Sequence, residues 1–239
     1  CIHGAWLEVS VDDHFPCRPE CGGGPLFSQA HGNELWVLLL EKAYAKLQGG
    51  YYACRLGSPH EALIDQTGAP VYKMDLKDGE ISFADFLAWD RCDCLVCAST
   101  PGVDELTEGG RPGGQKAGLV PGHAYTVVQA RRITRTRRYH GHEVLQIRNP
   151  RGSFEWGGAW GDSSAELREC KAELDDDGGG GGGGDGANDA NDGLFWMSFA
   201  DFRTAFVSVS VCAPFPLQQG ATLAPPRRLV TVPATDGLP

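Results

Sequence analysis

One segment of the chain, Gly118-Leu-Val-Pro-Gly-His-Ala-Tyr-Thr-Val-Val128, places a histidine where it could transfer protons. His123 follows Pro121-Gly122 and leads directly into an alternating pattern that predicts a strand. A rigid turn before a strand would project the imidazole at the mouth of that strand, a position that suits a general base. A single histidine is more often structural than catalytic, so this segment alone leaves both interpretations open.

Two later segments add polar groups that suit the same kind of site. Asn149 lies in Ile147-Arg-Asn-Pro-Arg-Gly152, where a predicted strand breaks into a turn, and its amide could bond to an imidazole nitrogen. Asn-Pro is also an ordinary turn sequence. The segment Glu155-Trp-Gly-Gly-Ala-Trp-Gly-Asp162 then brings two carboxylates and two indoles within eight residues. Packing in a core would explain the tryptophans but not the flanking acids.

Taken together, the three segments resemble the calpain family of calcium-dependent cysteine proteases. That family has histidine in Gly-His-Ala-Tyr, asparagine in Arg-Asn-Pro-Trp-Gly, and then a Glu-Trp-x-Gly-x-Trp-x-Asp pattern. The resemblance covers roughly residues 5–212. It extends to Trp6, Val11-Asp-Asp13, Gly32-Asn-Glu-Leu-Trp36, Leu40-Glu-Lys-Ala-Tyr-Ala-Lys46 and Asp192-Gly-Leu-Phe-Trp-Met-Ser-Phe199.

The resemblance implies a papain-like protease core of the α+β class and a Cys-His-Asn triad. His123 would form the thiolate–imidazolium pair and later protonate the leaving amine, and Asn149 would fix the tautomer and orientation of the imidazole. The thiolate would attack a peptide carbonyl of a protein substrate, and water would hydrolyse the acyl-enzyme. The implied function is a calcium-dependent cysteine endopeptidase, in which calcium draws two lobes together and brings the thiolate within reach of the histidine.

The nucleophile departs from the family pattern. In calpains it lies in a Gln-Gly-x-x-Gly-Asp-Cys-Trp stretch, which this chain does not contain. Cys1, Cys17, Cys21 and Cys54 precede the histidine, but none of them sits before a tryptophan or opens a predicted helix. We therefore expect the catalytic cysteine upstream of this chain, and we expect the chain by itself to be inactive. The alternative is a catalytically inactive calpain-like module with a binding or regulatory role.

A second departure is Arg151, which stands where the family has a tryptophan that shields the His–Asn hydrogen bond from water. Without this tryptophan, water would reach the His–Asn hydrogen bond and the triad would be weaker. We expect Trp156 and Trp160 to cover part of the site instead.

The resemblance also implies Ca²⁺ as a cofactor, with one ion in each lobe. The matching acids of the second lobe are Glu155, Asp162 and Asp192, and Glu34 matches a ligand of the first lobe. Leu194 stands where the family has a further acid, and calcium prefers six to eight oxygen ligands. We therefore expect a weakened second-lobe site. The alternative is that these acids only cap turns.

The elements that would position these residues form two lobes. We expect residues 1–90 to be the end of a helical first lobe and residues 91–213 to be a β-rich second lobe that carries the histidine and the asparagine. Residues 175–190 read as a flexible Gly/Asp insertion and residues 214–239 as a Pro-rich linker or tail. The predicted helices span residues 33–48, with Asn33 as N-cap, and 82–89. Ser82-Phe-Ala-Asp85 has the signature of a capping box with Asp in place of Glu, and Ser198-Phe-Ala-Asp201 repeats that signature. The predicted strands span 5–11, 95–99, 124–132, 143–148, 194–197 and 207–211.

Charge and cysteine content limit the classes of partner. Lys+Arg number 21 against 31 Asp+Glu, a formal net charge of −10, which argues against nucleic-acid binding. No apolar run approaches the ~18–20 residues of a membrane span. Nine scattered cysteines predict a reducing, cytoplasmic setting rather than a disulfide scaffold. The chain begins with Cys1, so an upstream membrane segment in a longer protein stays open.

Two further motifs have competing interpretations. Cys92, Cys94 and Cys97 have the spacing of half a zinc site, but their apolar neighbours favour a buried strand. Five arginines over Arg131–Arg138 predict a basic hairpin. A solvated face is the simple interpretation, and contact with an anionic membrane or an acidic partner is the alternative.

Overall fold

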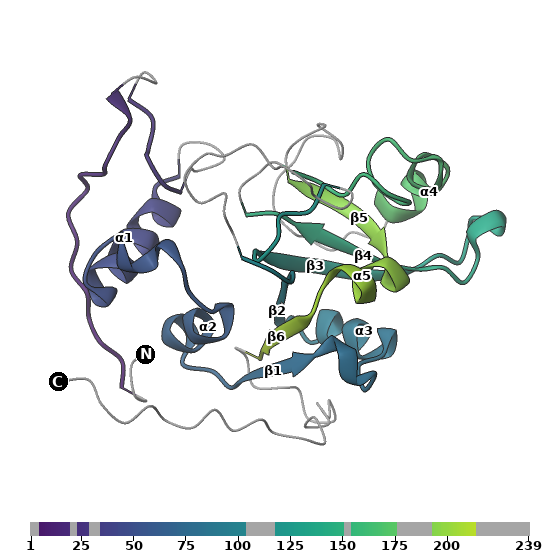
Figure 1. The fold of residues 1–239 in the computed structure, drawn as a ribbon, viewed down its shortest axis with the longest axis horizontal. Coiled ribbons are helices and arrows are strands. Elements are labelled where there is room, and N and C mark those ends of the chain that lie inside the picture. The colour runs from purple at the N-terminus through teal and green to yellow at the C-terminus, as the bar shows by residue number, and fades with distance from the viewer. Residues whose placement is uncertain are drawn as a thin grey trace. The chain divides into compact units, whose positions relative to one another are not determined.

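The computed structural model describes residues 5–19, 23–28, 34–103, 118–150, 154–175 and 193–213. The chain divides into two compact units, Cys1–Gly68 and Ala69–Pro239 (Figure 1). The boundary falls after Gly68, whereas we expected a lobe boundary after residue 90. It falls earlier because the strand and helix that follow Gly68 pack on the sheet of the second unit. The assignment of the two protease lobes to these ranges stays a prediction.

The first unit is built around helix α1, Trp36–Gln48. The helix begins with Leu35 at the N-cap position, and the expected cap, Asn33, lies outside the described residues. It ends at Gly49, whose φ of 96° suits a glycine in the left-handed region. A 3-10 turn (Ala53–Arg55) and helix α2 (Pro59–Thr67) follow.

The strand predicted over residues 5–11 is wrong, since Trp6–Ser10 is irregular. No partner strand pairs with this segment among the described residues; instead, lysine side chains of α1 contact it and the residues that follow it. Lys46 Nζ donates to the carbonyl of Ser10 at 2.7 Å, and the Lys42 ammonium contacts the Asp12 carboxylate. Alternation of apolar residues is therefore not enough to form a strand here, because the backbone N–H and carbonyl groups of a strand also need hydrogen-bond partners in a neighbouring strand.

The second unit is a six-stranded antiparallel sheet with helices, so the predicted α+β class is confirmed. The strand order is β1-β6-β2-β3-β4-β5. The elements are β1 (Val71–Asp75), a 3-10 turn (Leu76–Asp78), α3 (Phe83–Arg91), β2 (Leu95–Ser99), β3 (Ala124–Arg132), a 3-10 turn (Arg137–Tyr139), β4 (Glu143–Arg148), α4 (Ala165–Asp175), β5 (Leu194–Ser198), α5 (Phe199–Ala205) and β6 (Ser208–Cys212).

Two helices of this unit begin as their capping signatures predict. Ser82 and Asp85 form a capping box at the start of α3, in which Ser82 N–H donates to Asp85 Oδ2 at 2.7 Å. At the start of α5, Asp201 N–H donates to the hydroxyl of Ser198 at 3.0 Å. These contacts satisfy N–H groups that the first turn of a helix leaves without intrahelical partners.

Alternation along the strands separates two hydrophobic cores. Neighbouring residues of β5 show it: Phe195 belongs to the core with the aromatics of α3 and α5, and Trp196 belongs to the core with α4. The first core is rich in aromatic contacts, such as Phe86 against Phe202 with ring centroids 5.4 Å apart. The sheet is thus covered on both faces.

The expected insertion over residues 175–190, apart from Asp175, and the expected tail over residues 214–239 lie outside the described residues. Across the parts of the chain that the structure describes, no helix combines the length and the apolar character needed to cross a bilayer.

Candidate active site

His123 lies immediately before β3, at the end of a turn that its neighbours shape. Pro121 fixes the backbone φ of the turn, and Gly122 adopts a positive φ of 61°, the combination that a type II turn requires. The end of β2 holds the histidine backbone from the other side. Thr100 N–H donates to the carbonyl of His123 at 3.0 Å, and His123 N–H donates to the hydroxyl of Thr100 at 2.9 Å.

Antiparallel pairing brings Asn149 to the same edge of the sheet. Thr126 of β3 pairs with Arg148 of β4, so the residue that follows β4 lies level with the start of β3. His123 Nε2 and Asn149 Oδ1 are 3.1 Å apart, which is hydrogen-bond distance. Asn149 is fully buried, whereas His123 is half-buried. The structure thus brings together the two residues that the sequence singled out.

The amide of Asn149 determines which imidazole nitrogen carries a proton. Its Nδ2 donates to the carbonyl of Phe154 at 3.1 Å, so Oδ1 is the atom that faces the ring. Oδ1 only accepts hydrogen bonds, and His123 Nε2 must therefore be protonated. In the neutral ring, the lone pair is then on Nδ1, and this nitrogen can act as a base.

Tyr125 supports the pair from within the core. Its ring meets that of His123 edge-on, with centroids 5.2 Å apart, and its hydroxyl oxygen accepts a hydrogen bond from Val120 N–H at 2.8 Å. Sequence reasoning placed Tyr125 only within the Gly-His-Ala-Tyr pattern and missed Thr100 altogether. The position of Thr100 directly after a predicted strand was the available signal.

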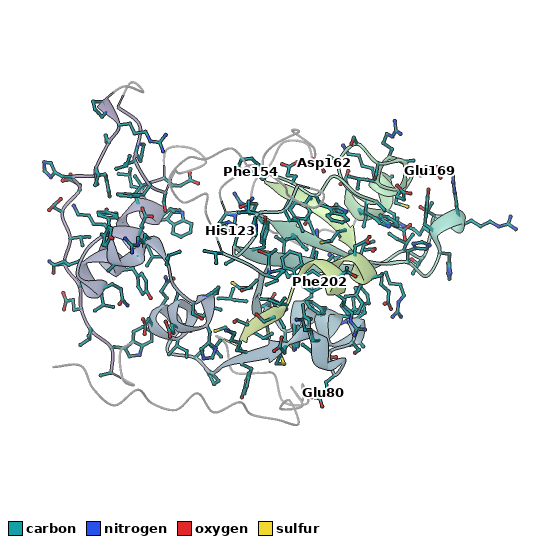
Figure 2. All side chains as sticks on the ribbon, viewed as in Figure 1. Glu80, His123, Phe154, Asp162, Glu169 and Phe202 are labelled. Atoms are coloured by element: carbon teal, nitrogen blue, oxygen red, sulfur yellow. The ribbon has the colours of Figure 1, made fainter. Side chains whose placement is uncertain are left out.

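The loop after Asn149 is tied to it by a ring of hydrogen bonds. Asn149 N–H donates to the carbonyl of Gly193 at 2.7 Å, and Gly193 N–H donates to Glu155 Oε1 at 2.7 Å. Phe154, the acceptor of the Asn149 side chain, has a φ of 66°, which is unusual for an aromatic residue. Glu155 and Asn149 are therefore coupled through two routes, Phe154 and Gly193. Figure 2 labels His123 and Phe154 on the second unit.

The two tryptophans of this loop have different surroundings. Trp156 is half-buried against the first core, and its Nε1 donates to the carbonyl of Ala159 at 2.8 Å. Trp160 is buried in the second core and packs against Tyr139, with centroids 5.4 Å apart. Trp160 is thus a core residue, and the expectation that it covers the His–Asn pair is not met. Arg151 lies outside the described residues.

The expected calcium ligands are oxygen donors, as calcium requires. Both carboxylate oxygens of Asp162 are buried, and one oxygen of Glu155 is bonded to Gly193 N–H. These two acids supply oxygen donors of the kind that calcium binds, but Asp192 lies outside the described residues and Leu194 contributes no oxygen from its side chain. Glu34 is exposed just before α1 in the other unit.

One group of three metal-ligating side chains lies close together within the described ranges. It is Asp12, Asp13 and His14, all exposed in the first unit. The ammonium of Lys42 already contacts Asp12 there. No further site is assigned to this group, because exposed acids often gather without a metal.

The described cysteines that show a pKa shift are poorly suited to nucleophilic attack. Burial raises the pKa of Cys94 and Cys97 to about 11, and burial also raises the pKa of Cys54 and Cys170. A reactive thiolate needs the opposite shift. Within the described residues, Cys92, Cys94 and Cys97 do not form a group of metal ligands.

Three of the five arginines in the basic hairpin between β3 and β4 pair with acids of their own unit. Arg131 pairs with Asp90 at 3.0 Å, and Arg132 pairs with its cross-strand partner Glu143 at 2.6 Å. Arg138 pairs with Glu169 of α4 at 3.0 Å. These pairs favour the solvated-face interpretation, and an anionic membrane or acidic partner stays a prediction.

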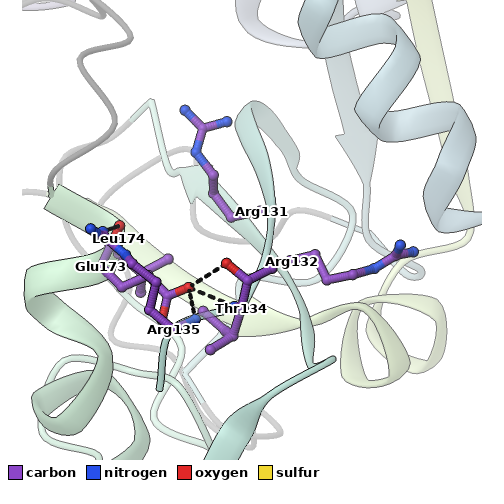
Figure 3. Close-up of a pocket in the computed structure, with 7 residues that line it drawn as sticks. Arg131, Arg132, Thr134, Arg135, Glu173 and Leu174 are labelled. Atoms are coloured by element: carbon purple, nitrogen blue, oxygen red, sulfur yellow. Dashed lines mark hydrogen bonds between the residues drawn. The ribbon is translucent and has the colours of Figure 1, made fainter. Parts of the chain in front are cut away.

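Glu173 of α4 fastens this hairpin beside a pocket of about 230 Å³ (Figure 3). Its Oε1 accepts hydrogen bonds from Thr134 N–H at 2.6 Å and Arg135 N–H at 2.8 Å, and its Oε2 accepts one from Thr136 N–H at 2.9 Å. Burial would raise the pKa of this carboxyl, but the backbone N–H groups outweigh it and lower the pKa from 4.5 to about 2. Figure 3 shows the side chains of Arg131 and Arg132 extending away from Glu173.

We expect Glu173→Gln to destabilise the second unit by about 1–2 kcal/mol at pH 7, after allowance for solvent screening. A depressed pKa contributes stability that is present above pH 4.5 and is lost as the pH falls toward 2. The difference in unfolding free energy between wild type and variant should therefore shrink in acid. Urea titrations at several pH values measure it, with Glu169→Gln as control because its pair with Arg138 is exposed. An equal loss at every pH would contradict this explanation.

The comparisons with known proteins agree with this geometry. The model of the calpain family cysteine proteases matches residues 1–213. The chain is 38% identical to the calpain-type cysteine protease ADL1 of Oryza sativa subsp. japonica over 90% of its own length, and 35% identical to calpain-9 of Rattus norvegicus over 88%. Calpain-14 of Homo sapiens is 34% identical, also over 88%. The chain spans 9% of the length of the rice relative, 29% of the rat one and 28% of the human one. The chain belongs to the calpain family of cysteine proteases.

Proposed function

We propose that the protein is a calcium-dependent cysteine endopeptidase in which His123 is the general base and Asn149 orients it. The hydrogen bond from His123 Nε2 to Asn149 Oδ1 carries this proposal, because it leaves Nδ1 as the basic nitrogen. The full burial of Asn149 keeps water from competing for the bond. Both residues also stand where the family pattern has its histidine and asparagine.

In this mechanism His123 Nδ1 takes the proton of a cysteine thiol and becomes part of a thiolate–imidazolium pair. The thiolate attacks the peptide carbonyl, and the imidazolium returns its proton to the leaving amine as the C–N bond breaks. Water then hydrolyses the acyl-enzyme with His123 as base. Asn149 holds the Nε2–H throughout, so that the ring cannot turn its basic nitrogen away from the thiol.

The nucleophile of the proposed triad is a cysteine outside the described residues, in a segment that precedes this chain in a longer protein. The raised pKa values of Cys54, Cys94, Cys97 and Cys170 support this, because each of these thiols stays protonated at neutral pH. On this proposal the chain by itself does not cleave peptides. The substrates are proteins.

When bound, calcium would supply a divalent charge to the carboxylates of Glu155 and Asp162, with Asp192 as a further ligand. Glu155 is bonded to Gly193, and Gly193 in turn accepts from Asn149, so the state of this carboxylate bears on the position of the asparagine. Leu194 in place of an acid weakens the proposed site. Glu34 would belong to a separate ion in the first unit.

We propose a reducing, cytoplasmic setting for this protein. Six of its described cysteines are free thiols: Cys17, Cys54, Cys92, Cys94, Cys97 and Cys170. Such thiols persist where glutathione and thioredoxin keep cysteines reduced.

A second function, an inactive binding or regulatory module of calpain type, is favoured by one observation. Leu194 stands where the family pattern has a further acid, so its side chain supplies no oxygen to the calcium site that the peptidase would need. Covalent labelling distinguishes the two functions. The longest natural form of the protein that contains this chain is treated with a thiol-reactive epoxide, with calcium or with a chelator, and analysed by mass spectrometry. The peptidase labels at one cysteine in calcium and not in chelator, whereas the inactive module does not label in either.

A further inference from the structure

We propose that Thr100 is a positioning residue that fixes the backbone of His123, and through it the imidazole, by bridging the turn before β3. This inference rests on the proposed function, since it concerns the base of the same reaction. Thr100 follows β2 directly and is 7% exposed. Its hydroxyl donates to the carbonyl of Val120 at 2.7 Å and accepts from His123 N–H at 2.9 Å.

The hydroxyl lies between the two groups that a β-turn would otherwise join. In the turn from Val120 to His123, the first carbonyl and the last N–H are the natural partners of each other. The oxygen of Thr100 serves both at once, because a hydroxyl is able to donate and accept together. The carbonyl of His123 is also near the hydroxyl, at 3.2 Å, but Val120 is the closer acceptor.

The histidine is therefore held at two points. Thr100 fixes its backbone through both the N–H and the carbonyl, since Thr100 N–H donates to His123 O at 3.0 Å. Asn149 fixes the imidazole ring of His123 through the hydrogen bond at Nε2. A threonine is suited to hold the backbone of His123, because its branched Cβ restricts the side-chain rotamer and keeps the hydroxyl in place.

Removal of the hydroxyl would leave polar groups of the turn without their partner. Val120 is fully buried, so its carbonyl has little access to water as a replacement. The turn would have to tighten or admit a water molecule, and either change moves the Cα of His123. Displacements of about 1 Å in a catalytic group cost up to about 10²-fold in rate.

The test compares Thr100→Val, which has the shape of threonine without the hydroxyl, with Thr100→Ser, which keeps it. Thr204→Val is the matched control, because Thr204 is exposed on α5 and only bonds back to Ala200 O at 3.2 Å. Nitrogen NMR of the histidine rings in this chain reports the tautomer of His123 without any need for catalysis. Wild type, Thr100→Ser and Thr204→Val should show one Nε2–H tautomer, and Thr100→Val should show a mixture with faster exchange of the Nε2 proton.

In the longest natural form of the protein, Thr100→Val should lower kcat by about 10–10²-fold with KM within about twofold, and Thr100→Ser should recover most of it. Thr100→Ala removes the same hydroxyl and gives the same readout if the valine variant does not fold. A wild-type tautomer in a folded variant that lacks the hydroxyl would overturn the proposal. A wild-type tautomer signal in the native chain, together with no peptide cleavage by any form, would instead contradict the proposed function alone.

Discussion

Replacement of Gly118 by alanine is expected to destabilise the second unit by about 3 kcal/mol or more. An added Cβ would lie 2.0 Å from the carbonyl oxygen of Glu155, a distance that no non-bonded carbon and oxygen tolerate. The obstacle is backbone, so it cannot swing aside as a flexible side chain would. Gly118 also has a φ of 90°, which costs an alanine about 1–2 kcal/mol.

The expected damage extends to the candidate active site. Glu155 follows Phe154, whose carbonyl accepts from the Asn149 side chain, and a shift of Glu155 would strain that hydrogen bond. The close approach of Gly118 therefore keeps the segment that leads to His123 against the segment that holds Asn149. In the longest natural form of the protein, the variant should lose the proposed peptide cleavage at temperatures where it is still folded.

Gly141 supplies the control for this prediction. Its φ of 86° is almost the same, but an added Cβ there would meet nothing within 4 Å. Gly141→Ala should therefore cost only the backbone strain, about 1–2 kcal/mol. Unfolding by urea, followed through the buried tryptophans of the second unit, measures both variants. Equal losses for the two alanines would show that the contact with Glu155 does not matter.

Much of the second unit could be predicted from local sequence patterns. The predicted strands over residues 95–99, 124–132 and 143–148 coincide with β2, β3 and β4, because each has one strongly buried face. The strands predicted over 194–197 and 207–211 differ from β5 and β6 by one residue at their ends. Capping signatures also located the starts of α3 and α5.

The elements that were missed depend on contacts with distant parts of the chain. Helix α4 buries Leu167, Cys170 and Leu174, whose spacing is helical, but its charged surface and the acids that follow it concealed the pattern. Strand β1 is short, and it forms because it pairs with β6, which lies far from it in the sequence. Trp160 has a φ of 70° and enters the second core, which no local pattern indicates.

The sequence pattern predicted the His123–Asn149 part of the candidate site, and the reason is the geometry of antiparallel strands. His123 and Asn149 flank consecutive strands, and consecutive antiparallel strands place such flanking residues at one edge. The resemblance to calpains added their roles. Thr100 was missed because its part depends on one hydroxyl that reaches two backbone groups, and such a bridge is visible only in three dimensions.

His123→Ala is expected to abolish calcium-stimulated peptide cleavage by the longest natural form of the protein, with a loss of at least about 10³-fold. Without the imidazole, no group takes the proton of the thiol or returns it to the leaving amine. The fold should survive, because His123 is half-buried and its loss leaves the cores intact. His140→Ala is the matched control, since that histidine is exposed in the hairpin between β3 and β4.

The most direct measurement is therefore the initial rate of peptide cleavage in saturating calcium for wild type, His123→Ala and His140→Ala, each checked for an unchanged melting temperature. If His123 is the base, His140→Ala should cleave at the wild-type rate and His123→Ala should show no calcium-stimulated cleavage. Calcium-stimulated turnover that is unchanged in His123→Ala would contradict the assignment of the base, and with it the proposed triad.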